Sequence, residues 1–165
     1  MSNLIAPYIS LMKVCSSGVK DQQTQYKYMS HEEINAPKGQ LLSRTLAMPA
    51  DTNANGDIFG GWIMSQLDLA GGILAKEISH GRIVTVSVSS ITFKKPVGVG
   101  DVVCCYGECV RIGRSSMSIE LEVWVKPVLE HGIGERFQVC EATFNYVAVD
   151  SNGRPRTIER NQYNV

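Results

Sequence analysis

The sequence predicts an α+β fold in which one long helix lies across an antiparallel sheet. One segment, 61–79, places apolar residues at the spacing of a single helical face. Four later segments alternate apolar and polar residues with the period of two that is typical of β-strands. A helix with one apolar face buries that face against another layer, and the apolar side of an antiparallel sheet supplies that layer.

A short strand is the first element expected along the chain. Leu42, Arg44 and Leu46 alternate there with polar or small residues. The segment 51–57 then holds two Asp, two Asn and one Gly, residue types that form turns and loops. We therefore expect a strand and a long polar loop before the helix.

The helix is expected to begin at Gly60 and Gly61 and to end at His80 and Gly81. Between these points apolar residues recur at spacings of four and three, which places them on one face. The resulting stripe consists of Ile63, Leu67, Ala70, Leu74 and Ile78. This stripe is the surface that we expect to pack on the sheet.

The sheet is expected to follow the helix in the sequence. Apolar and polar residues alternate in four segments, which are 84–89, 101–111, 117–125 and 137–149. Turn-forming residues mark 96–100, 112–113, 131–132 and 151–153. The expected order is thus one strand, one helix and four strands.

We expect one folded domain at 41–158, an N-terminal extension at 1–40 and a C-terminal tail at 159–165. A chain of 165 residues falls in the usual size range for one domain and can bury a substantial core. The stretch 16–40 is polar and has no period, so the extension is expected to be flexible.

The composition argues against nucleic acid and membranes as partners. Sixteen basic and sixteen acidic residues cancel, which leaves no overall field for a polyanion or an anionic lipid surface. No apolar stretch approaches the roughly 20 residues that span a bilayer. The five cysteines are an odd number without paired CxxC spacing, so we expect reduced thiols and a cytoplasmic location.

Asp68 is the main candidate for catalysis. It lies two turns into the predicted helix, beyond the first turn where the helix dipole stabilises a carboxylate. Its neighbours on the helix surface are Met64, Gly72 and Ala75, and small residues allow another backbone to approach closely. A carboxylate on such a face is costly unless it is paired or used. The alternative is a solvent-exposed Asp on the flank of the helix.

The start of the helix is a second candidate site. The backbone N–H groups at Gly60 and Gly61 lack partners within the helix and could bind an anion or a developing oxyanion; a simple turn into the helix is the alternative. In the preceding loop, Asn55 and Asp57 are candidates for an assisting polar group. Such residues more commonly form turns or caps.

Cations and hydroxyls at predicted strand ends could bind a phosphate-bearing ligand. The candidates are Lys94, Lys95, Arg111, Arg114, Ser115 and Ser116. Solvated charges in turns are the alternative reading. The chain contains no GxxxxGK[ST] or GxGxxG phosphate loop, so a nucleotide would have to bind by other means.

Other hydrolytic chemistries find no support in the sequence. The chain has no GxSxG elbow for a serine hydrolase. His31, His80 and His131 fall in the extension, at a helix end and in a loop, which is a poor basis for a catalytic triad or a metal site. We expect no metal.

From about 41 to 158 the chain closely resembles the YciA-like acyl-CoA thioesterases of bacteria. The resemblance is carried by RTLAMP at 44–49, by DTNANGDIFGGW at 51–62 and by Asp68. It continues through VGDVV at 99–103, GRSS at 113–116 and EVWVK at 122–126. The resemblance implies a hotdog fold, in which a sheet wraps around one long helix.

The resemblance also implies roles for residues and an assembly. The helix carboxylate of the family matches Asp68, and the amide at the start of its catalytic helix matches Gly61. In related hotdog thioesterases these two groups come from opposite subunits of a dimer, and the dimers commonly assemble into hexamers. Whether Asn55 or Asp57 assists stays open. Coenzyme A would be part of the acyl-CoA substrate, and no separate cofactor is implied.

The expected reaction is hydrolysis of an acyl-CoA thioester. The thioester carbonyl would face the Gly61 N–H, and Asp68 would either activate a water or attack directly to give an anhydride. Two other functions are the alternatives: a hotdog dehydratase acting on hydroxyacyl thioesters, and a non-catalytic acyl-CoA sensor. The dehydratase would need a histidine near the helix start, and the sensor would lose the carboxylate.

Overall fold

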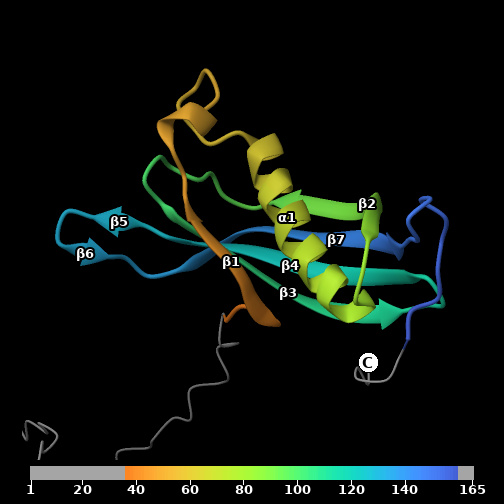
Figure 1. Ribbon diagram of the computed structural model, residues 1–165. Coiled ribbons are helices and arrows are strands. Elements are labelled where there is room, and N and C mark those ends of the chain that lie inside the picture. The colour runs from red at the N-terminus through yellow and green to blue at the C-terminus, as the bar shows by residue number, and fades with distance from the viewer. Residues whose placement is uncertain (1–35, 160–165) are drawn as a thin grey trace, which may run out of the picture. The chain divides into compact units, whose positions relative to one another are not determined.

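The computed structural model describes residues 36–159 and contains one helix packed on a five-stranded antiparallel sheet (Figure 1). The elements are β1 (Gln40–Leu46), the short 3-10 helix η1 (Pro49–Asp51), α1 (Gly60–Ser79), β2 (Ile83–Phe93), β3 (Val102–Ile112), β4 (Ser116–Lys126), β5 (Val128–Leu129), β6 (Gly132–Ile133) and β7 (Phe137–Ala148). The strand order in the sheet is β1-β3-β4-β7-β2. This confirms the predicted α+β fold class.

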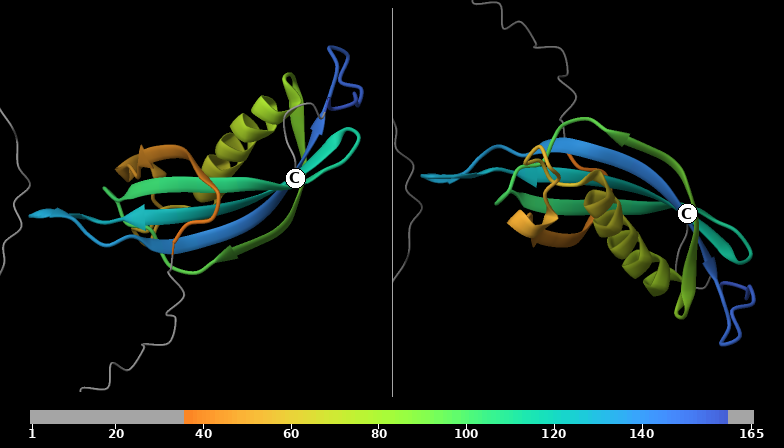
Figure 2. Two further views of the ribbon diagram at one scale, coloured as in Figure 1. Left: turned by 90° about the horizontal axis from the view of Figure 1, so that it is seen from below. Right: turned by 90° about the horizontal axis from the view of Figure 1, so that it is seen from above.

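Helix α1 lies on one side of the sheet only (Figure 2). All five residues of its predicted apolar stripe are buried, together with Gly71, Ala75 and Ser79. The helix ends at His80, which adopts the left-handed conformation with φ of 50°. The Arg156 guanidinium then donates from Nη2 to the carbonyl of Ser79 at 2.7 Å, which satisfies one of the last carbonyls of the helix.

The central strand β4 shows how the sheet separates core from surface. Its odd-numbered residues from Met117 to Val125 are buried against α1. Its even-numbered residues, such as Ser118 and Glu120, lie on the opposite side, which we call the outer face. The predicted alternation in this strand is therefore confirmed.

The ends of the domain differ slightly from the predicted limits. Strand β1 begins at Gln40, and the Lys38 backbone N–H donates to Glu122 Oε2 at 3.1 Å, so packing begins before residue 41. At the other end Ile158 is buried and its N–H donates to the Arg114 carbonyl. Most of the predicted extension, 1–35, and of the tail, 160–165, lies outside the described residues.

The short β5–β6 hairpin is not predicted by the sequence. Each strand has two residues, which is too short to show a period, and the predicted turn at 131–132 lies at its tip. The hairpin extends beyond the main sheet (Figure 1). In the described range no helix is both long enough and apolar enough to cross a membrane.

Strand β2 forms one edge of the sheet and leaves apolar side chains uncovered. Val84 and Val86 on this strand are exposed. On α1, Leu69 is 62% exposed and Ile73 is 48% exposed. An open strand edge with exposed apolar residues is a surface that another strand can pair with.

Candidate active site

Asp68 lies on the exposed flank of α1 and contacts β2. The Thr85 hydroxyl donates a hydrogen bond from Oγ1 to Asp68 Oδ1 at 2.6 Å. This is a short bond to a carboxylate, and bonds of this kind are the stronger ones in proteins. The contact holds the carboxylate in one orientation at the surface of the chain. Thr85 was not among the predicted site residues.

The backbone at Asp68 is fixed from the core side. The Tyr146 hydroxyl, on β7, donates to the Asp68 carbonyl at 3.3 Å. Burial and the nearby Asp68 charge raise the pKa of Tyr146, so its hydroxyl stays protonated and can donate. Gly71 makes this possible, because a Cβ at that position would lie 2.3 Å from the Tyr146 hydroxyl.

The first backbone amides of α1 have no partner within the helix. Phe59 is the N-cap residue, and its carbonyl accepts from the N–H groups of Trp62 and Ile63. Gly61 is exposed, and a Cβ there would meet nothing within 4 Å. Gly61 is therefore uncovered on this side, and a helix start favours a negatively charged ligand.

A pocket of about 380 Å³ lies beside this helix start. It is lined by Asp57, Ile58, Gly60, Phe93, Lys94, Lys95, Pro96 and Val97. The structure therefore brings three predicted groups together: the loop carboxylate, the glycine at the start of the helix, and the lysine pair at the end of β2. Asn55 does not line this pocket.

The polar loop before the helix is organised by Asn53. Its Oδ1 accepts hydrogen bonds from the N–H groups of Asn55, at 2.8 Å, and of Asp57, at 3.2 Å. Gly56 completes the turn with φ of +90°, which suits glycine. Asn53 thus has a structural role, and the loop directs Asp57 toward the pocket.

The two lysines at the end of β2 make contacts within the chain. Lys94 Nζ donates to Gln138 Oε1 at 2.8 Å and forms a salt bridge with Glu141. The hydrogen bond from Lys94 lowers the pKa of Glu141. Lys95 Nζ lies 4.9 Å from the centre of the Phe137 ring. Both ammonium groups are held near the pocket.

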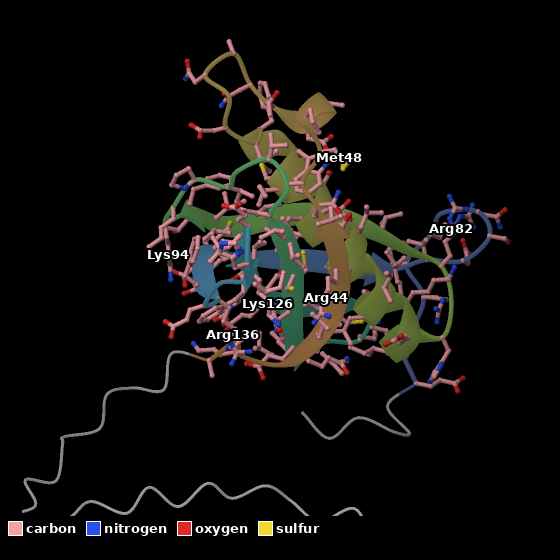
Figure 3. The ribbon with its side chains drawn as sticks, turned by 90° about the vertical axis from the view of Figure 1, so that its left-hand side faces the viewer. Arg44, Met48, Arg82, Lys94, Lys126 and Arg136 are labelled. Atoms are coloured by element: carbon pink, nitrogen blue, oxygen red, sulfur yellow. The ribbon has the colours of Figure 1, made fainter. Side chains whose placement is uncertain are left out.

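The other predicted phosphate-binding residues lie at the opposite end of the sheet. Arg111, Arg114, Ser115 and Ser116 surround the β3–β4 turn. The Ser115 carbonyl accepts from Ala148 N–H, and the neighbouring Val149 N–H donates to the Arg82 carbonyl. Figure 3 shows Arg82 and Lys94 at opposite ends of the molecule. Within one chain, the lysine pair at the end of β2 therefore lies far from the predicted phosphate-binding residues of the β3–β4 turn.

Gly61 and Asp68 are also too far apart in one chain to act on one atom. Seven residues separate them on α1, which corresponds to about 10 Å along the helix axis. A thioester would need its carbonyl oxygen about 3 Å from the Gly61 N–H and its carbonyl carbon within reach of Asp68, directly or through one water. A site that uses both groups requires a second helix.

The cysteines behave as small apolar residues. Cys104, Cys105 and Cys140 are buried in the sheet. Burial raises the pKa of Cys105 to about 11 and that of Cys140 to about 12, so their thiols stay protonated at neutral pH. Cys15 lies outside the described residues. Within 36–159 no group of three or more His, Cys, Asp or Glu could hold a metal ion.

Comparison with known proteins shows that this helix-on-sheet chain is a thioesterase of the hotdog type. The model of the thioesterase superfamily matches residues 55–130. The structure also superposes on a hexameric hotdog fold thioesterase of Campylobacter jejuni with a TM-score of 0.70. The two are 43% identical, and the match covers 73% of this chain and 91% of that one.

Two curated relatives narrow the family further. The chain is 64% identical to the acyl-CoA thioester hydrolase YciA of Escherichia coli K12, over 75% of this chain and 94% of that protein. It is 68% identical to an acyl-CoA thioester hydrolase of Haemophilus influenzae, over 74% of this chain and 80% of that protein. The chain belongs to the YciA-like acyl-CoA thioester hydrolases, which confirms the resemblance found in the sequence.

Proposed function

We propose that this protein hydrolyses acyl-CoA thioesters to a carboxylic acid and coenzyme A, with Asp68 as the catalytic carboxylate. The observation that carries the proposal is the position of Asp68, in a chain that belongs to this family. It lies on an otherwise small and apolar helix flank and is oriented by Thr85.

The catalytic unit in this proposal is a dimer formed along the open edge of β2. Pairing of two β2 strands in antiparallel fashion would bury Val86, Leu69 and Ile73, which are exposed in one chain. The two α1 helices would then run antiparallel across the two-fold axis. This arrangement places Asp68 of one chain opposite Gly61 of the other, which a single helix cannot achieve.

The same two-fold axis would unite the proposed coenzyme A contacts. Antiparallel pairing of β2 brings the end of one sheet that carries Lys94 and Lys95 beside the end of the other that carries Arg114 and Ser115. Arginine, lysine and hydroxyl groups together suit the phosphates of coenzyme A. Arg111 and Ser116 belong to the same turn and are part of the proposed set.

The proposed reaction uses groups of two chains. The Gly61 N–H donates to the thioester carbonyl oxygen and stabilises the negative charge that develops there. Asp68 either removes a proton from a water that attacks the carbonyl carbon, or attacks it directly to give an anhydride that water then hydrolyses. The C–S bond breaks and coenzyme A leaves as a thiolate. A thiol pKa of about 8.5 makes this a good leaving group, so the proposal includes no separate general acid and no cofactor.

Asp57, rather than Asn55, is the loop group that we propose to assist. Its pocket position beside Gly60 supports this choice. The Campylobacter jejuni protein is hexameric, and we propose that three dimers of this chain form a hexamer. We also propose a cytoplasmic location, which the use of buried cysteines as apolar core residues supports.

The experiment that tests the function is release of free thiol from a panel of acyl-CoAs, followed with a thiol reagent. Turnover of several acyl-CoAs is the expected result. Binding without turnover would favour an acyl-CoA sensor, and hydration or dehydration of hydroxyacyl thioesters would favour a dehydratase. The same panel reports the preferred acyl chain.

A further inference from the structure

Met64 places a large apolar side chain beside the proposed catalytic carboxylate. It shares one flank of α1 with Gly61, Asp68 and Gly72, because spacings of three and four residues fall on one side of a helix. We call these four residues the catalytic flank, and Met64 alone among them has a large apolar side chain. It is 36% exposed, and it belongs neither to the buried core nor to the half-buried residues that pack against that core.

Two contacts place this stretch of α1 beside the edge strand β2. At one end, a Cβ added to Gly60 would lie 3.4 Å from the Phe93 ring. At the other end, the Thr85 hydroxyl donates to the Asp68 carboxylate. The stretch of helix between these contacts, which includes Met64, therefore lies beside the part of β2 between Thr85 and Phe93.

That part of β2 presents apolar side chains on the helix side of the sheet. Val88 pairs across strands with Phe144, and Ile91 pairs with Ala142. Both of these β7 residues are buried in the core. Since cross-strand partners point to the same side of a sheet, Val88 and Ile91 point away from the outer face. Together with Met64 they supply an apolar lining beside Asp68.

The predicted phosphate-binding residues indicate the side of Asp68 on which coenzyme A lies. Arg156 donates to the Ser79 carbonyl and Ile158 donates to the Arg114 carbonyl, so the β3–β4 turn lies near the C-terminal end of α1. The lysine pair lies beside the start of α1. In the proposed dimer the C-terminal end of one helix lies beside the start of the other. Coenzyme A would therefore lie beyond Asp68, toward the C-terminal end of its helix.

The acyl chain is left with the opposite direction, toward the two-fold axis of the proposed dimer. Antiparallel helices that place Asp68 opposite Gly61 have this axis midway between the two residues, about 5 Å from Asp68 along the helix. Met64 is four residues from Asp68, which corresponds to about 6 Å. The two copies of Met64 would therefore meet at the axis, and one acyl chain would approach them from each side.

We propose that Met64 forms the end of the acyl pocket and thereby determines which acyl chain lengths the enzyme hydrolyses best. The inference rests on the proposed function and assigns a specificity-determining residue to that same site. The two Met64 side chains of a dimer form a wall at the two-fold axis, which separates its two acyl pockets. Short acyl groups end before this wall, whereas longer ones must displace it.

Methionine suits this position because its side chain is unbranched and adaptable. It has three rotatable bonds and fills irregular space, so it can move aside by a change of rotamer as the acyl chain lengthens. On the coenzyme A side of Asp68 the flank carries Gly72, where a Cβ would meet only Ile83 Cδ1, at 3.9 Å. The catalytic flank is thus open on the side of coenzyme A and closed by an apolar side chain on the side of the acyl group.

The experiment compares butyryl-, octanoyl- and lauroyl-CoA as substrates of the full chain. Met64→Ala shortens the wall and should raise the ratio of kcat/KM for lauroyl-CoA to that for butyryl-CoA by about tenfold or more. Met64→Phe enlarges the wall and should lower the same ratio. Met64→Leu conserves volume and should keep the wild-type ratio. The matched control is Leu69→Ala, an exposed apolar position about 100° around the helix from Asp68, which should leave the ratio unchanged.

A change of the same factor for all three substrates in Met64→Ala would assign Met64 to packing of the dimer and overturn the inference. An unchanged ratio in both Met64→Ala and Met64→Phe would also overturn it and leave the proposed function intact. Binding of S-butyl-CoA and S-dodecyl-CoA, thioethers that cannot be hydrolysed, gives the same comparison by calorimetry without turnover. A wild type that binds these thioethers, tightens on the longer one in Met64→Ala, and hydrolyses no acyl-CoA would overturn the proposed function while supporting the pocket.

Discussion

The Thr85 hydroxyl and the Asp68 carboxylate are joined by a hydrogen bond of 2.6 Å that connects β2 to α1. Both residues lie beside the open edge of the sheet, where a second chain is proposed to pair. The same contact therefore orients the candidate catalytic group and links it to the strand that would form the dimer. Changes at either residue should affect catalysis more than folding.

Replacement of Asp68 by Asn should lower kcat by about 10²–10⁴-fold, the usual contribution of a general base. The amide keeps the size of the side chain and can still accept from Thr85, so the oligomer should persist. Thiol release measures the rate, and size exclusion measures the assembly. Glu77→Gln, at an exposed position of the same helix, is the control and should retain full activity. Substantial turnover by Asp68→Asn would remove this residue from the mechanism.

Replacement of Thr85 by Val should lower kcat by about tenfold with little change in KM. The methyl group fills the space of the hydroxyl but cannot donate, and a hydrogen bond to a charged group contributes about 1.5–3 kcal/mol. Thr85→Ser keeps the donor and should recover most of the rate. A Thr85→Val variant that keeps the wild-type rate would contradict the role of the hydroxyl, and a Thr85→Ser variant as slow as Thr85→Val would show that the methyl group matters as well.

Replacement of Gly71 by Ala should destabilise the fold by about 1–3 kcal/mol, the usual cost of overpacking. The added Cβ would lie 2.3 Å from the Tyr146 hydroxyl and 2.9 Å from Leu121 Cδ1. Thermal unfolding measures the effect. Gly72→Ala is the matched control, because its Cβ would meet only Ile83 Cδ1, at 3.9 Å. An equal fall in the melting temperature of Gly72→Ala would show that the contact with Tyr146 is not the cause of the destabilisation.

Replacement of Arg156 by Ala should cost about 1–3 kcal/mol of stability, since it leaves a buried acceptor without its charged donor. Arg156 donates to the Ser79 carbonyl at 2.7 Å and to the Val149 carbonyl at 3.2 Å, which ties the C-terminal segment to the end of α1. Denaturant unfolding measures the loss. The exposed Arg154 provides the comparison. The Arg154→Ala variant should have the same denaturant midpoint as the wild type.

The three buried thiols, Cys104, Cys105 and Cys140, should react with a thiol reagent only after unfolding. Burial removes them from solvent, and it raises the pKa of the latter two to about 11 and about 12. Thiolate is the reactive form, so a raised pKa lowers the rate at neutral pH. Mass spectrometry of the labelled protein, with and without denaturant, identifies the modified positions. Rapid labelling of the native protein at Cys140 would contradict the described packing.

Most of the fold could be predicted from the sequence, because the helix and the long strands each have a local pattern of apolar residues. The apolar stripe from Ile63 to Ile78 and the alternation in β4 each follow from one element and its period. The β5–β6 hairpin was missed because no period exists in two residues. Strand limits shifted by a few residues, as at Gln40, where tertiary contacts extend the strand.

Only part of the candidate site could be predicted from the sequence, because its contacts join residues of different elements. Asp68 stood out as a carboxylate among small residues, and the resemblance gave it a role. Thr85 did not stand out, because only the crossing of β2 against α1 brings it to Asp68. The phosphate-binding candidates were chosen by residue type, and no sequence pattern indicates that Lys94 and Arg114 lie at opposite ends of the sheet.

The distance along α1 between Gly61 and Asp68 has a consequence for the newly made protein. If the proposed site needs two chains, a folded chain that has not yet paired with another should contain every catalytic group and have no activity. Its activity should then grow with the square of chain concentration when the protein is dilute, and become linear once pairing is complete. The cell would obtain hydrolysis of its acyl-CoA pool only above a threshold of expression, with no inhibitor involved.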